Sequence, residues 1–154
     1  MRAVIRRDKR LVCDEIAELT PAAGQVLVKT LACGICGSDL HALHYMEHMI
    51  DLSRRAGGAM DGGFDPTADT VFGHEFCAEI LDHGPGSTKA LKAGTRVVSV
   101  PVTMHDGGVE ALGFSNRLPG GFAEQMLLTE AMVLPVPNGL PTDKAALEKM
   151  VIAK

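Results

Sequence analysis

The chain has 154 residues, a formal net charge of −4 and a hydrophobic fraction of 46%. This length favours one compact domain with its own core and leaves no room for a second full one, because domains take roughly 100–200 residues. The weak acidic balance indicates no general affinity for nucleic acid or an anionic membrane. With no leader-like segment and no spanning apolar run in these residues, the sequence predicts a cytoplasmic protein without a membrane contact.

The sequence predicts mostly short strands, separated by turns rich in glycine and proline. The predicted strands are Ala3–Arg6, Leu11–Ile16, Gln25–Ala32, Glu75–Leu81, Arg96–Val100, Phe122–Leu128 and Met132–Val136. A short helix is expected to begin near Ser38 or Asp39, and another over Pro141–Met150. Many short strands with little helix favour a mainly β fold, an irregular β-barrel or sandwich. Residues 42–70 differ from this pattern and are predicted to form a loop insertion.

Four cysteines are present, and in a reducing compartment they are packing, metal-binding or catalytic groups rather than disulfides. Cys33 and Cys36 form a C-x-x-C pair. An all-cysteine zinc knuckle would need a second pair, whereas Cys13 and Cys77 stand alone. A thioredoxin-like pair would need a βαβ frame, which the strand pattern does not predict. A core role for Cys33, with Cys36 incidental, also stays open.

A histidine and a glutamate follow a glycine at Gly73-His74-Glu75. One thiolate, one imidazole and one carboxylate would supply the three protein ligands of a catalytic zinc ion and leave its fourth position open. In a regular strand His74 and Glu75 would point to opposite faces, so both reach one ion only if Gly73 marks a bend. Otherwise Glu75 orients the ligands from behind, or His74 is a core residue without a ligand role.

The segment Cys36-Gly37-Ser38-Asp39-Leu40-His41, followed by Gly73-His74-Glu75, resembles the catalytic-domain signature of zinc-dependent medium-chain alcohol and polyol dehydrogenases. Further segments agree with this family in order, namely Val26–Lys29, Gly94–Val98, Gly120–Glu124 and Val136–Pro141. The resemblance implies a GroES-like β-barrel that forms a zinc-binding catalytic domain over residues 1–154. No G-x-G-x-x-G segment lies between a strand and a helix, so the family's nucleotide-binding Rossmann domain is expected to be absent from this chain.

The resemblance also implies a metal-binding set. Cys36 and His74 correspond to the thiolate and imidazole ligands of the catalytic zinc, and Glu75 to the adjacent carboxylate, a ligand or a group behind one. Asp39 would hold the ligands in place, and Glu148 is a candidate fourth ligand, with an exposed helix residue as the alternative. A structural zinc ion is expected to be absent, because residues 101–118 contain no cysteine.

Ser38 resembles the hydroxyl that contacts the alcohol oxygen, and His41 resembles the outer member of a proton relay and a contact of the nicotinamide cofactor. The implied reaction is hydride transfer between a small alcohol, polyol or amino alcohol and NAD or NADP, with the 154-residue chain inactive alone. The full-length protein is expected to be a homo-oligomer. A non-catalytic GroES-like binding module and a zinc hydrolase are the alternatives. Within residues 42–70, the candidates for shaping a substrate entrance are Tyr45, Met46, His48 and Met49. For His44 and His48, exposed loop positions are the favoured alternative.

Overall fold

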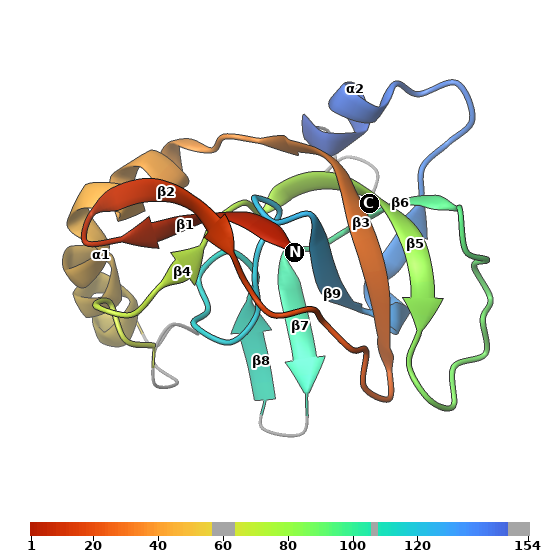
Figure 1. The fold of residues 1–154 in the computed structure, drawn as a ribbon, viewed down its shortest axis with the longest axis horizontal. Helices are drawn as coiled ribbons and strands as arrows, with labels where there is room; N and C mark the ends of the chain where they lie inside the picture. Colours follow the sequence, from red (N-terminus) through yellow and green to blue (C-terminus); the bar gives the residue numbers. More distant parts are fainter. Residues whose placement is uncertain (57–63, 106–107, 148–154) are drawn as a thin grey trace.

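The computed structural model describes residues 1–56, 64–105 and 108–147, and its fold is mainly β with two α-helices (Figure 1). The strands are β1 (Arg2–Arg7), β2 (Arg10–Glu15), β3 (Gln25–Gly34), β4 (Thr70–Val71), β5 (Glu75–His83), β6 (Arg96–Ser99), β7 (Val102–His105), β8 (Gly108–Ala111), β9 (Gln125–Thr129) and β10 (Val133–Pro135). The helices are α1 (Gly37–Arg55), the 3-10 turn η2 (Glu130–Met132) and α2 (Thr142–Leu147). The predicted β fold class is therefore confirmed.

A five-stranded antiparallel sheet, in the order β10-β6-β5-β3-β9, forms the body of the molecule. Val26 and Val28 of β3 are fully buried, as the alternation in this segment predicts. The pairing of β3 with β5 shifts register at two points, and such irregularities let a sheet curl around its core. That core consists of Val26, Val28, Phe76, Ala78, Ile80, Val97, Leu112, Met126, Leu128 and Val133.

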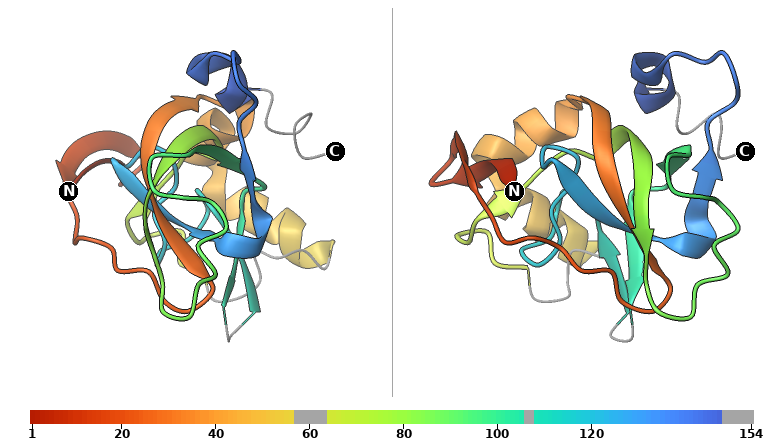
Figure 2. Two further views of the ribbon diagram at one scale, coloured as in Figure 1. Left: turned by 90° about the vertical axis from the view of Figure 1, so that its right-hand side faces the viewer. Right: turned by 45° about the vertical axis from the view of Figure 1, so that its right-hand side comes forward.

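Two smaller sheets flank this body (Figures 1 and 2). Strands β2, β1 and β4 form the first, in which Ile5 of β1 lies opposite Val71 of β4. Strands β7 and β8 form the second, a hairpin within a segment for which the sequence predicted no strands. Gly120, Gly121 and Phe122 hydrogen-bond to the backbone of Val71–Gly73, which ties the approach to β9 to the turn before β5.

Helix α1 is longer than predicted, because the expected loop over residues 42–70 is helical as far as Arg55. Ala42, Met46 and Ile50 recur every four residues and are buried against Phe72, so packing stabilises these extra turns. Met46 is fully buried, so the prediction that it shapes a substrate entrance is wrong. His44 and His48 are exposed as expected, although they lie on this helix rather than in a loop.

Helix α2 confirms the predicted helix near the end of the chain as far as Leu147. Ala145 and Ala146 are buried beside Cys77, Val98 and Val136 at one end of the main sheet. The remainder of that predicted helix, which includes Glu148, lies outside the described residues. Among the described residues, no helix is long and apolar enough to cross a membrane.

Candidate metal centre

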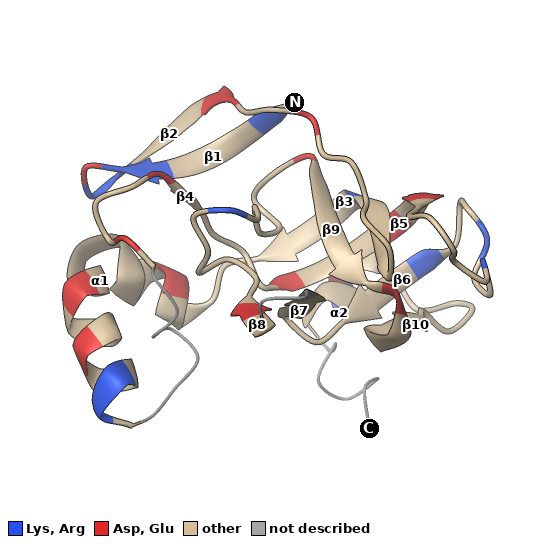
Figure 3. Cartoon of the chain, turned by 90° about the horizontal axis from the view of Figure 1, so that it is seen from below, with Lys and Arg blue, Asp and Glu red and all other residues tan. Residues whose placement is uncertain are grey.

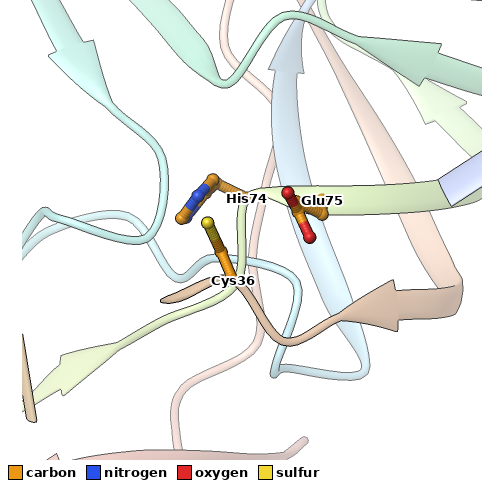
Figure 4. A group of neighbouring side chains, drawn as sticks. All are labelled: Cys36, His74 and Glu75. Atoms are coloured by element: carbon orange, nitrogen blue, oxygen red, sulfur yellow. The ribbon is translucent and has the colours of Figure 1, made fainter. Parts of the chain in front are cut away.

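Cys36, His74 and Glu75 come together where β3 and β5 run side by side (Figure 4). Cys36 follows the end of β3 and caps the N-terminus of α1, whereas His74 and Glu75 stand at the start of β5. Glu75 lies opposite Gly34 in the β3–β5 register. One ligand atom from each of the three residues lies within 4.8 Å of the other two, and no other such group of three occurs among the described residues.

The backbone bends at Gly73, as is needed for His74 and Glu75 to face one ion. Its φ of +97° lies in the left-handed region, which glycine adopts without a steric penalty. A Cβ atom at this position would come within 2.7 Å of the Phe122 backbone nitrogen and 2.9 Å of the Cys33 sulfur. Gly73 therefore turns the chain before β5, and this turn allows His74 and Glu75 to face the same point.

The Cys36 thiol is prepared for ionisation. Hydrogen bonds from the Ser38 hydroxyl and then from the Ser38 backbone lower the pKa of Cys36, and His74 adds to this effect. Partial burial opposes the shift, but the pKa still lies below its ordinary value. Because the thiolate is the form that binds metals, this environment favours a metal ligand over an inert core cysteine.

The two ring nitrogens of His74 have different neighbours. Nδ1 lies 3.3 Å from Oδ1 of Asp39, a carboxylate that is only 2% exposed. Nε2 lies 3.3 Å from the Ser38 hydroxyl oxygen. Oδ2 of Asp39 accepts a hydrogen bond of 3.0 Å from the Cys36 backbone N–H. Asp39 thus contacts both the imidazole and the loop that carries the thiol, which is how a carboxylate behind a metal-binding histidine fixes ring orientation and tautomer.

The donor set and the space around it fit zinc. Thiolate, imidazole and carboxylate are the groups that this ion takes in proteins, and three of them leave a position for water or substrate. Gly34 leaves room for Glu75, since a Cβ atom at Gly34 would lie 2.9 Å from Glu75 Oε2. The structure therefore provides a three-residue group able to hold one divalent ion.

Other predicted residues lie around this group or apart from it. Ser38 is part of it through its contacts with Cys36 and His74. His41 is exposed one helical turn further along α1. Cys33 instead packs beside Gly121, where a Cβ atom would approach its sulfur to 2.6 Å.

The other two cysteines are also outside the group, since Cys13 is exposed and Cys77 is buried. Burial raises the pKa of Cys77. The sequence missed Phe114, whose ring centroid lies 5.5 Å from that of His74. No motif surrounds this phenylalanine, so only the tertiary contact identifies it.

Comparison with known proteins agrees with this geometry. Residues 22–138 match the family described as "Alcohol dehydrogenase GroES-like domain". The chain therefore belongs to this family, within the zinc-type medium-chain alcohol dehydrogenases, and the resemblance read from its sequence is confirmed.

Several characterised relatives are similar along most of the chain. A (R,R)-butanediol dehydrogenase of Bacillus subtilis (strain 168) is 31% identical over 147 residues, which cover 90% of this chain and 41% of that protein. An L-threonine 3-dehydrogenase of Xanthomonas campestris is 25% identical over 158 residues, which cover 95% of this chain and 43% of that protein. The crystal structure of 2R,3R-butanediol dehydrogenase from Bacillus subtilis has a TM-score of 0.71 and 26% identity, covering 95% of this chain and 43% of that one. The chain thus spans about two fifths of the length of these relatives.

Proposed function

We propose that residues 1–154 are the zinc-binding catalytic domain of a dehydrogenase that transfers hydride between an alcohol and NAD or NADP. The convergence of Cys36, His74 and Glu75 within 4.8 Å is the observation that carries this proposal. Family membership supports it, because the relatives include dehydrogenases of butanediol and threonine. The nucleotide-binding domain would lie outside the chain. A small polyol or amino alcohol is the proposed substrate class, and cytoplasmic location and homo-oligomer formation stay predictions.

Cys36, His74 and Glu75 would hold the zinc ion, with Glu148 as a further candidate. Zinc bound there supplies a Lewis acid, which lowers the pKa of an alcohol hydroxyl toward neutrality. Asp39 Oδ1 lies 3.3 Å from Nδ1 of His74 and would orient the ring so that Nε2 is left for the metal. This division of the two nitrogens explains why a buried carboxylate belongs behind the metal ligands.

Ser38 and His41 would move the proton that the alcohol loses. The Ser38 hydroxyl lies at the ligand group, within 3.3 Å of His74 Nε2, and both accepts and donates hydrogen bonds. His41 is three residues further along α1, so it lies on the same side of the helix as Ser38, and it is exposed. An imidazole can accept a proton on one ring nitrogen and donate one from the other, which suits the transfer of a proton to solvent. The same position makes His41 the proposed contact of the nicotinamide cofactor.

Zinc binding by the chain itself tests the proposal. We expect the chain to bind one zinc ion tightly. Structural zinc sites gain about 10–16 kcal/mol from four ligands, or roughly 3–4 kcal/mol for each ligand. Loss of one ligand in Cys36→Ser should therefore weaken zinc binding by roughly 100–1000-fold. Cys13→Ser is the matched control, since Cys13 is exposed and outside the ligand group. Equal affinity in the two variants, or no zinc uptake by folded protein, would refute the proposal and favour a non-catalytic GroES-like module.

The same chain should form no reduced cofactor when incubated with alcohols and NAD or NADP. The reason is that His41 would be only one contact of the nicotinamide, and the proposed nucleotide-binding domain would supply the others. Absorbance of the reduced cofactor measures this, and robust turnover would show that the assignment of the cofactor site to another domain is wrong.

A further inference from the structure

The exposed face of α1 carries a row of rings that the proposed function uses only at one end. His41, His44, Tyr45 and His48 recur at spacings of three and four residues, which places them along one side of the helix. All four side chains are exposed, Tyr45 by 59%. The opposite side is anchored in the core through Ala42, Met46 and Ile50. The helix that carries this row is therefore held in place by the core.

The backbone brings the two ends of this row together. Tyr45 departs from helical geometry, with φ −125° and ψ 32°, so the helix kinks between His41 and His48. Their ring centroids lie 6.4 Å apart, although seven residues separate them. Two imidazoles that share one tetrahedral ion at zinc–nitrogen distances of about 2.0–2.1 Å have ring centroids about 5 Å apart. The rings of His41 and His48 would therefore have to approach by about 1 Å to share an ion, which rotation of two exposed side chains allows.

These imidazoles are available for a ligand. None of the three histidines in the row has a hydrogen bond or ion pair within the described parts of the chain, whereas His74 and His83 each have a polar neighbour. The basic residues of α1, Arg54 and Arg55, are confined to its last turn (Figure 3). Glu47 and Asp51 lie on the same helix and form ion pairs with Lys9 at 3.4 Å and Arg55 at 2.8 Å, so each of these two cations is balanced by a carboxylate.

We propose that His41 and His48 together bind one divalent transition-metal ion, separate from the ion at Cys36, His74 and Glu75. Neutral imidazole suits zinc and copper(II), and water would complete the coordination. His44 is left out of this pair, since its ring lies beside Tyr45 with centroids 6.3 Å apart, whereas the rings of His41 and His48 lie beside each other. One consequence, which rests on the proposed function, is inhibition: an ion on His41 would occupy the imidazole that releases the substrate proton.

Calorimetric titration of the full chain with Zn²⁺ tests this site. We expect a tight first step and a weaker second step in the wild-type chain. His41→Ala and His48→Ala should each weaken the second step by roughly tenfold or more, because one exposed imidazole alone binds zinc poorly. Cys36→Ser should weaken the first step and keep the second. His44→Ala is the matched control from the same helix face and should keep both.

The outcomes separate the two proposals. A tight step with no weaker step in the wild-type chain, an unchanged second step in either His41→Ala or His48→Ala, or its loss in His44→Ala would overturn the second site. Absence of the tight step, with a weaker step that both His41→Ala and His48→Ala reduce, would count against the proposed function and keep the second site. Because the three exchanged histidines are exposed, circular dichroism spectra of their variants should match the wild type and confirm that they are folded.

Discussion

Asp39→Asn separates the orientation of a metal ligand from the stability of the fold. The wild-type carboxylate is almost fully buried, with Oδ1 3.3 Å from His74 Nδ1 and Oδ2 3.0 Å from the Cys36 backbone nitrogen. Asparagine has nearly the same size, and its carbonyl oxygen can still accept the hydrogen bond from Cys36. The exchange therefore keeps the beginning of α1 and removes the negative charge beside the imidazole.

We expect this exchange to weaken zinc binding by about 10–100-fold, which is the usual effect of removing a carboxylate behind a metal-binding histidine. That loss corresponds to about 1.4–2.8 kcal/mol. The free energy of unfolding without metal should change much less, because burying a carboxylate beside a histidine contributes little net stability. A large difference between the two effects is the mark of an orienting role.

The measurement is competition for Zn²⁺ with a chromophoric chelator at fixed pH, combined with urea unfolding of the metal-free chain. Asp65→Asn is the matched control, since Asp65 also accepts a backbone hydrogen bond, from Thr67, but is exposed and outside the ligand group. If the folded Asp39→Asn variant bound zinc as tightly as the wild type, Asp39 would have no part in positioning His74.

Three further exchanges and one control exchange test the scaffold. Gly73→Ala should lower the free energy of unfolding in urea by about 2–4 kcal/mol, because Gly73 has a left-handed backbone and close neighbours. Gly86 has a φ of +75° but open space around it, so Gly86→Ala should lower the free energy of unfolding by only about 1–2 kcal/mol. Equal losses in the two variants would contradict the close approach at Gly73. Met46→Ala should cost about 2–5 kcal/mol in the same assay, and a loss below that range would mean that α1 is not anchored by this side chain. A hydrogen bond from Arg7, more than its charge, lowers the pKa of Asp69, so the ionised form stabilises the fold above the usual carboxylate pKa of about 3.9 and this stability is lost as pH falls through the lower folded value. Asp69→Asn should therefore lower the melting temperature at pH 7, and a difference from wild type that failed to shrink below about pH 4 would refute the assignment.

Most of the strands were predicted from patterns of neighbouring residues. The alternation in β3 identified a half-buried strand, and the strands flanked by glycine and proline turns were also found. The length of α1 was not predicted, because Ala42, Met46 and Ile50 are stabilised by Phe72, a residue of another segment. The β7–β8 hairpin was missed because its strands are four residues each, and Met104 and Val109 remain half exposed.

The sequence by itself determined the family and the chemical types of the candidate ligands, because the motifs around Cys36 and around His74 and Glu75 consist of neighbouring residues. Only the tertiary structure decided that the two motifs meet. Pairing of β3 with β5 carries the cysteine to the histidine, and the left-handed Gly73 turns both members of the His74–Glu75 pair toward it. Such convergence depends on strand register and on one backbone angle, which are set by contacts between segments far apart in the chain.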